Sequence, residues 1–133
     1  MRVVKLFLNF LVLTSVLFLI TSCGGGDTNP VIPNPFSGSY EGTYTGTESG
    51  TWTGTVTTSG VFNVTIWSPS LGQCTGVGTV TQTGGVSLQT SGAGGGSGVT
   101  FNWTGSIDTS THNCSGSWTS SAGYSGTWTG HET

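Results

Sequence analysis

The chain has 133 residues, of which only 5% are charged, and its formal net charge is −3. Both basic residues, Arg2 and Lys5, stand at the amino terminus, so the rest of the chain has acidic side chains without any Lys or Arg. Nucleic acids and anionic lipid headgroups are bound through clusters of basic side chains. This composition therefore argues against both as partners.

The first 22 residues have the layout of a secretion signal. A basic start is followed by an apolar run from Leu6 to Ile20 and then by the small residues Thr21 and Ser22. The run is shorter than the roughly 20 residues that a helix needs to cross a bilayer. We therefore expect residues 1–22 to be a removable signal rather than a permanent membrane span.

The segment Leu19–Cys23 reads LITSC. It resembles the lipobox of bacterial lipoproteins, in which an aliphatic residue and two small residues precede a cysteine. The resemblance implies that the Cys23 thiol receives a diacylglyceryl group, that the signal is cut before Cys23, and that the new amino terminus is acylated, for example with palmitate. More than one acyl chain gives stable membrane anchoring. The alternative is an ordinary secretion signal with a chance cysteine.

Gly24 directly follows the cysteine. This resembles the pattern that lets such lipoproteins leave the inner membrane where an outer one exists. The expected location is therefore the bacterial cell envelope, with the chain anchored to the outer membrane through Cys23 and facing either the periplasm or the exterior.

A tether is predicted behind the cysteine. Residues 24–35 read GGGDTNPVIPNP, with no periodic apolar pattern and with Gly or Pro at both ends. Such a segment holds a domain away from a lipid surface when it is flexible. The expected division is a signal over 1–22, a lipidated cysteine and tether over 23–36, and one β domain over 37–133.

From Phe36 onward, apolar and polar side chains alternate with a period of two, which places one set on each face of a strand. Eight short strands are predicted, over Tyr40–Gly46, Trp52–Val56, Phe62–Ile66, Cys74–Val80, Val86–Leu88, Val99–Ile107, Cys114–Trp118 and Tyr124–Trp128. Turn formers separate them, so consecutive strands are expected to pair as an antiparallel meander. Closing such a meander removes exposed strand edges. The predicted fold is an all-β, up-and-down barrel.

The aromatic side chains are expected to face the barrel interior, where alternating glycines leave space for large rings. The alternative is a membrane barrel with its aromatic side chains toward lipid. A membrane-spanning strand needs about nine to eleven residues, whereas the strands predicted here have about five to eight. The inward orientation is therefore favoured.

Two internal repeats support this organisation. SGTWTG occurs at 49–54 and again at 125–130, and FNVT at 62–65 is echoed by FNWT at 101–104. Duplication of a hairpin and coincidence in a chain of low complexity both explain them. The region Gly38–Gly130 resembles Gly, Ser and Thr rich β domains of bacterial lipoproteins of unknown function. Its Gly-Thr-Trp strand starts are more faintly similar to avidin-type barrels, and neither resemblance implies a site residue.

Cys74 and Cys114 remain once Cys23 is assigned to lipid. In an exported protein, a disulfide between them is the default expectation. The predicted strand order starts their strands at opposite barrel ends, and Cα atoms more than about 7 Å apart cannot be bridged. Two free buried thiols are therefore the alternative.

Few side chains are candidates for catalysis. Asp108 and His112 lie close together in a predicted turn among several hydroxyl residues, but the chain has no Gly-x-Ser-x-Gly motif. His131 and Glu132 do not form a metal-ligand spacing such as His-x-x-x-His with His112. We therefore expect no enzyme activity, no metal and no cofactor.

Trp67 is the one aromatic residue out of phase, because the apolar residues from Phe62 to Ile66 share a face that Trp67 does not. An exposed ring at a strand end could stack on a sugar or another ligand, and the alternative is a loop ring folded over the barrel mouth. Trp52 and Trp128 are the other candidates for ligand contact at the mouth.

Two functions are compatible with these features. The first is a membrane-anchored, non-catalytic envelope or surface lipoprotein with a structural or interaction role, as the lack of titratable groups suggests. The second is a lipocalin-like or avidin-like module that binds a small apolar or sugar ligand at the barrel mouth. A filled barrel centre favours the first.

Overall fold

The computed structural model describes residues 30–92 and 98–133. The expected signal, the lipobox with Cys23 and the tether up to residue 29 lie outside the described residues and stay predictions. One compact unit comprises Ile32–Thr133. Its described residues include no helix of the length and apolar character that a membrane span requires.

Eight strands make up this unit, as the alternation predicted. They are β1 (Gly38–Gly46), β2 (Gly50–Val56), β3 (Val61–Ser68), β4 (Gly72–Val80), β5 (Gly85–Gly92), β6 (Thr100–Ile107), β7 (Cys114–Ser120) and β8 (Ser125–Glu132). The turns after β2 and β4 each hold a glycine with positive φ, Gly60 at 83° and Gly84 at 87°. Glycine adopts this conformation without steric cost.

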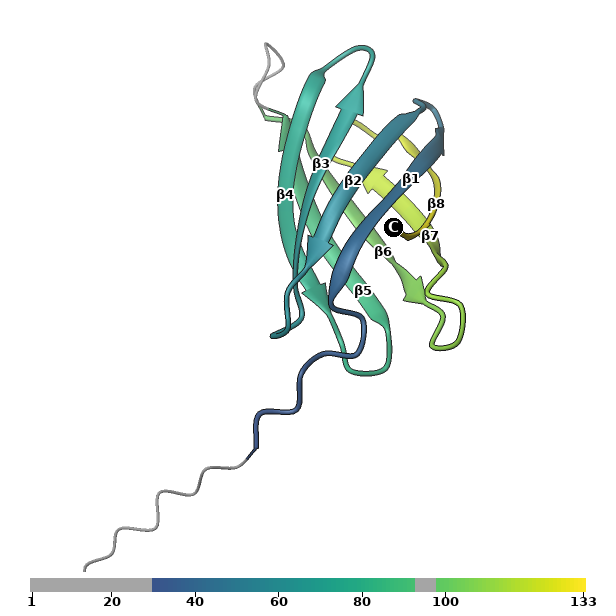
Figure 1. The fold of residues 1–133 in the computed structure, drawn as a ribbon. Coiled ribbons are helices and arrows are strands. Elements are labelled where there is room, and N and C mark those ends of the chain that lie inside the picture. Colours follow the sequence, from purple (N-terminus) through teal and green to yellow (C-terminus); the bar gives the residue numbers. More distant parts are fainter. Residues whose placement is uncertain (1–29, 93–97) are drawn as a thin grey trace, which may run out of the picture. The chain divides into compact units, whose positions relative to one another are not determined.

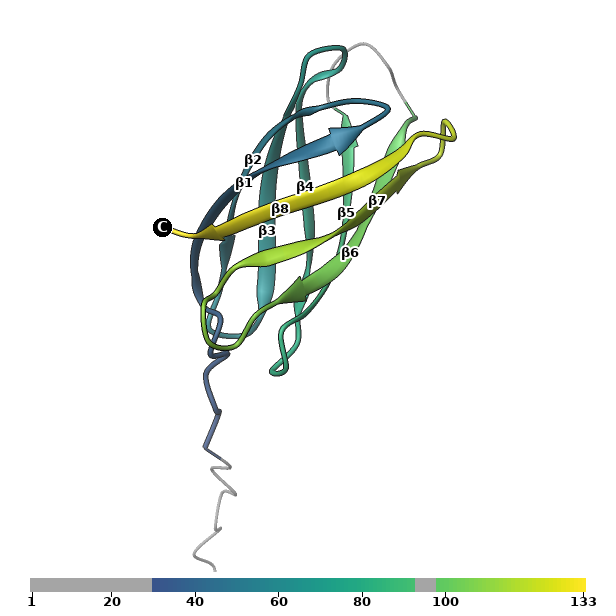
Figure 2. The same cartoon turned by 90° about the vertical axis from the view of Figure 1, so that its right-hand side faces the viewer.

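Each strand pairs with its neighbours in the chain, and β8 pairs with β1, so the sheet closes into an antiparallel up-and-down barrel (Figures 1 and 2). In the closing pair, Tyr44 lies opposite Trp128 and Gly42 opposite Gly130. The turns after β2, β4 and β6 lie at the lower end in Figure 1. The predicted fold class is confirmed.

The inward face of the barrel holds the aromatic core. Along β2 the buried positions are Trp52 and Val56, and the intervening Thr53 and Thr55 are exposed. The other strands follow the same alternation, and the largest buried rings are those of Tyr40, Tyr44, Phe62, Phe101, Trp103, Trp118 and Trp128. The rings therefore face the interior, which is the reverse of what the membrane-barrel alternative requires.

Glycines make room for the indole rings, as predicted. A Cβ atom added at Gly42 would lie 2.7 Å from Trp52 Nε1, and one at Gly126 would lie 2.7 Å from Trp118 Nε1. Trp52 Nε1 donates a hydrogen bond to the Thr129 carbonyl, beside the same glycine face. Each indole thus lies against bare backbone and keeps its N–H satisfied inside the core.

The barrel unit begins earlier in the chain than expected. Asn34 and Phe36, both assigned to the tether in the sequence-based division, are buried with 3% and 1% of their surface exposed. The Asn34 side-chain amide donates to the Val80 carbonyl (2.7 Å), and the Phe36 carbonyl accepts from the Tyr40 hydroxyl (3.0 Å). These contacts close the lower barrel end, so residues 34–36 belong to the domain rather than to the tether.

Cys74 and Cys114 are both buried free thiols, so the expected disulfide is absent and the alternative holds. Cys74 lies opposite Ile66 near the start of β4, and Cys114 lies opposite Ile107 at the start of β7. These strands start at opposite ends of the barrel (Figure 1). Because the two strands start at opposite ends, the two thiols lie apart, and this explains why no disulfide joins them.

Candidate ligand-binding surface

The interior of the barrel is filled by side chains. Tyr44 packs edge to face against Trp103 with ring centroids 5.5 Å apart, and Phe101 lies 5.9 Å from Trp118. Two gaps between core side chains have volumes of about 10 Å³ each. That volume is at the lower limit for a single water molecule. These gaps have no space for a ligand of the kind that lipocalin-type barrels enclose.

The outer wall of β1–β5 carries mainly polar side chains, with the exposed Val77 and Trp67 among them, in three rows across the strands. Cross-strand partners point to the same face, so the strand registers align them. The first is the Ser39 row, made of Ser39, Thr55, Asn63, Val77 and Gln89. The second is the Glu41 row, made of Glu41, Thr53, Thr65, Thr75 and Ser91. The third is the Trp67 row, made of Thr43, Thr51, Trp67 and Gln73.

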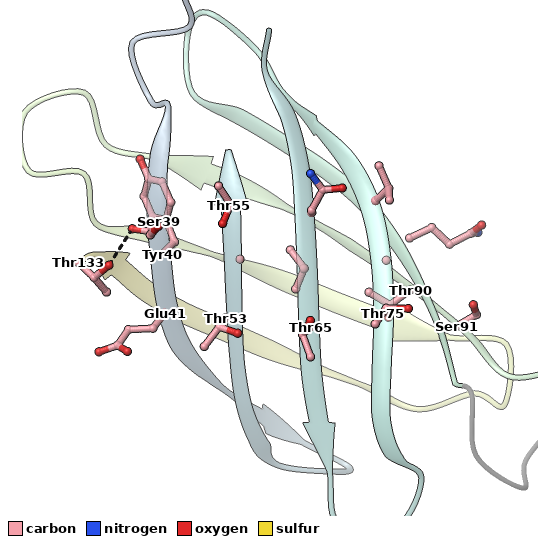
Figure 3. Close-up of a pocket in the computed structure, with 16 residues that line it drawn as sticks. Ser39, Tyr40, Glu41, Thr53, Thr55, Thr65, Thr75, Thr90, Ser91 and Thr133 are labelled. Atoms are coloured by element: carbon pink, nitrogen blue, oxygen red, sulfur yellow. Dashed lines mark hydrogen bonds between the residues drawn. The ribbon is translucent and has the colours of Figure 1, made fainter. Parts of the chain in front are cut away.

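The Ser39 row and the Glu41 row line a shallow groove of about 840 Å³, which we call the outer groove. Figure 3 shows the hydroxyl side chains of Thr53, Thr55, Thr65 and Thr75 distributed over neighbouring strands of this wall. Glu41 is the single charged residue in its lining. The groove therefore presents hydroxyl and amide groups around the exposed apolar side chain of Val77, with a carboxylate near one edge.

A second hollow of about 260 Å³ surrounds Trp67 and adjoins the outer groove, since Thr53 and Thr65 line both. We call it the Trp67 depression. Trp67 stands between Thr51 on β2 and Gln73 on β4, its register partners, and the three residues line the depression together. An exposed ring is thus placed between a hydroxyl and an amide group.

Trp67 differs from the other four tryptophans. It is 61% exposed, whereas each of the others is almost fully buried. The indole N–H groups of Trp52, Trp103, Trp118 and Trp128 all donate hydrogen bonds. Within residues 30–92 and 98–133, no such bond is recorded for the Trp67 indole. Its ring and its donor are both available to a ligand.

Of the three tryptophans proposed as ligand contacts, Trp67 and Trp52 both line the Trp67 depression, and Trp128 lines neither hollow. Trp52 and Trp128 pack against each other in the core, with ring centroids 5.7 Å apart and 4% and 3% of their surface exposed. Both rings are buried because they stand at inward positions of the alternation, like the other core residues. Trp67 lies within β3 on the outer wall, not in a loop over the mouth.

The titratable side chains near the barrel ends have structural partners. Glu48 accepts hydrogen bonds from Ser68 and Ser70, and His112 Nδ1 lies 2.5 Å from Glu132 Oε2. Hydrogen bonds hold the pKa of Asp108 well below its usual range. The largest effect comes from the Ser110 hydroxyl, and the main-chain N–H groups of Thr111 and Ser110 and the Thr111 hydroxyl add to it. No group of three or more metal-ligating side chains occurs within the described ranges.

Burial raises the pKa of both described thiols. The apolar surroundings raise the pKa of Cys114 to about 11. Burial also raises the pKa of Cys74, and the nearby Glu48 carboxylate adds a smaller increase. A raised pKa lowers the thiolate fraction at neutral pH, and the thiolate is the nucleophile. Neither thiol is therefore suited to nucleophilic chemistry.

The fold and this surface define the described chain as an eight-stranded β-barrel with a filled interior and a polar outer groove. Comparisons with protein families, with curated proteins and with solved structures found no match to the chain. The groove itself was missed at the sequence level. Its two rows unite residues up to 52 positions apart, from Ser39 to Ser91, and only the alternation of outward hydroxyl residues gave a signal for it.

Proposed function

We propose that this protein is a lipid-anchored, non-catalytic protein of the bacterial envelope, and that its barrel acts by contact through the outer wall. The observation that carries the contact role is the filled interior. Because the gaps inside hold about 10 Å³ each, a partner has to be contacted on the outside, where the outer wall carries a groove of about 840 Å³.

The lipid anchor is supported by the lipobox-like segment before Cys23 and by the absence of Lys and Arg from the rest of the chain. Without basic side chains, the domain is not held at a membrane by attraction to anionic headgroups. Covalent acyl chains supply that attachment without any basic surface.

The non-catalytic assignment is supported by where the titratable groups lie. The Asp108 carboxylate accepts four hydrogen bonds from Ser110 and Thr111 in a turn. Cys74 and Cys114 are buried thiols with raised pKa values. These three groups stabilise a turn or fill the core, and Glu41 is the one carboxylate that lines the outer groove.

Metabolic labelling with an alkyne analogue of palmitate tests the anchor in cells. The wild-type protein should be labelled and recovered with membranes, and Cys23→Ser should be unlabelled and released from them. Ser22→Ala, which keeps a small residue before the cysteine, is the matched control and should be labelled like the wild type. An unlabelled wild-type protein would rule out the anchor.

A further inference from the structure

We propose that the Trp67 depression and the outer groove together bind an extended, neutral glycan. This inference names a partner class for the contact role of the outer wall and so rests on that role, but it does not depend on the anchor at Cys23. In this arrangement the Trp67 indole stacks on one sugar ring, and the adjoining hydroxyl and amide groups bind the hydroxyls of the following sugars.

The exposure of Trp67 is the first observation behind this proposal. Tryptophan is a large, mainly apolar side chain that is highly buried on average, yet this ring is 61% exposed near the end of β3, beside a mainly polar wall. An indole has an apolar face and one polar edge, which suits partners that are themselves apolar on one face and polar at the edges. A pyranose ring, with C–H groups on its face and hydroxyls at its rim, has that character.

The neighbours of Trp67 supply polar groups that can bind the hydroxyls of a sugar. Thr51 and Gln73 flank the ring, and Thr65 joins the depression to the outer groove. A threonine hydroxyl both donates and accepts, and a glutamine side chain offers an acceptor oxygen and two donor hydrogens. Sugar hydroxyls likewise donate and accept, so this lining can satisfy them in either direction.

The extent of the surface favours a chain of sugars over a single one. The Ser39 row and the Glu41 row each cross five strands, from β1 to β5. With a strand spacing of about 4.8 Å, four intervals give a length of roughly 19 Å. The Trp67 row lies alongside, so one extended ligand can contact the ring and the groove together.

The charge of the surface selects neutral glycans. Glu41 is the one charged side chain that lines either hollow, and it is negative. The chain has no Lys or Arg beyond residue 5 to attract uronate or sulfate groups. Anionic polysaccharides are therefore disfavoured by repulsion from Glu41, whose carboxylate has the His131 imidazole 3.7 Å away as its neighbour.

The test uses the full-length lipidated protein in a zwitterionic detergent, because glucoside and maltoside detergents carry competing sugar headgroups. Cellohexaose, chitohexaose and maltohexaose are titrated by calorimetry, with polygalacturonate and heparin as anionic probes. Acrylamide quenching of tryptophan fluorescence is recorded in parallel. We expect at least one neutral probe to bind and to protect the Trp67 indole from quenching, and neither anionic probe to bind.

Variants locate the site. Trp67→Ala should weaken binding by about tenfold or more, which corresponds to about 1.4 kcal/mol. Trp67→Tyr should restore most of the affinity, and Thr65→Val, which removes one hydroxyl at nearly constant shape, should weaken it severalfold. Tyr124→Ala removes another exposed aromatic ring that lines neither hollow and should leave binding unchanged. Melting temperatures of the variants report whether the barrel is intact.

Three results would overturn the proposal: no neutral probe bound by the wild type, equal binding by Trp67→Ala, or preference for an anionic probe. None of them bears on the anchor, because labelling at Cys23 is read separately. Conversely, glycan binding by an unlabelled protein would refute the anchor and leave this inference standing.

Discussion

Trp52 and Trp128, which occupy the same position in the two copies of the hexapeptide SGTWTG, pack edge to face with ring centroids 5.7 Å apart and an interplanar angle of 85°. The two copies lie on β2 and β8, which flank β1 on either side in the closed sheet. The repeated segment thus supplies two halves of one aromatic contact. Such a contact adds about 0.5–1.5 kcal/mol beyond the burial of apolar area.

Removing one of these rings should therefore weaken the fold strongly. Trp128→Ala is expected to lower the free energy of unfolding by about 3–5 kcal/mol, because it opens a cavity in a filled core. Trp128→Phe keeps a ring but removes the donor to the Thr104 carbonyl, and should cost about 1 kcal/mol or more. Urea unfolding followed by circular dichroism measures both. Trp67→Ala is the control and should change stability by no more than about 0.5 kcal/mol.

Substitution of the glycines beneath the indoles should also destabilise the barrel. A methyl group at Gly126 would meet the Thr45 carbonyl and lie 2.7 Å from Trp118 Nε1, so backbone or ring has to shift. Gly126→Ala is expected to destabilise the barrel by about 1–3 kcal/mol, as overpacked cores do. In Gly92→Ala the nearest atom is Cys74 Sγ at an ordinary 3.6 Å, so this variant should be nearly neutral. A comparable loss of stability in both variants would contradict the packing argument.

Much of the barrel could be predicted because each strand repeats one local rule. The alternation of Trp52 and Val56 with threonines determines which face is buried, and turn formers between strands determine the meander. The same rule showed that Trp67 is out of phase with Ile66, but it did not decide between an exposed ring and a ring folded over the barrel mouth. Closure follows from the need to remove exposed edges rather than from any single residue.

The rest depends on contacts between residues distant in sequence. Nothing local distinguishes Asn34 from the Gly and Pro rich tether before it, and the alternation that starts at Phe36 does not show that this ring closes the barrel end. Their burial arises because Asn34 reaches the Val80 carbonyl, 46 residues away, and Phe36 packs against His112 with ring centroids 5.7 Å apart. The outer groove likewise exists only once the registers of five strands are set.

The thiols offer a direct check of the barrel order. In the Cys23→Ser variant, Cys74 and Cys114 should both resist Ellman's reagent at about pH 8, because they are buried and burial raises their pKa values. After unfolding in guanidinium without reductant, two thiols per chain should react. Failure of any thiol to react in the unfolded protein would instead indicate a disulfide, and with it a strand order different from the one described.

Asp108 should make the stability of the barrel depend on pH in the acid range. Its side chain accepts hydrogen bonds from the Ser110 and Thr111 hydroxyls and main-chain N–H groups, which hold its pKa in the folded protein below the unfolded value of about 3.9. A depressed pKa means that the folded state favours the ionised carboxylate. The contribution to stability is therefore fully present above about pH 4 and is lost as the pH falls further.

Urea midpoints of the wild type and of Asp108→Asn, measured from about pH 7 down to about pH 2, isolate this contribution from that of the other acids. At neutral pH the variant should be the less stable, because an amide accepts some of the same hydrogen bonds but lacks the charge that strengthens them. Below about pH 4 the difference between the two midpoints should shrink, because the Asp108 carboxylate of the unfolded wild type takes up a proton before that of the folded protein. A difference that stays constant over the whole range would show that Asp108 acts through shape alone and that its ionisation does not stabilise the turn.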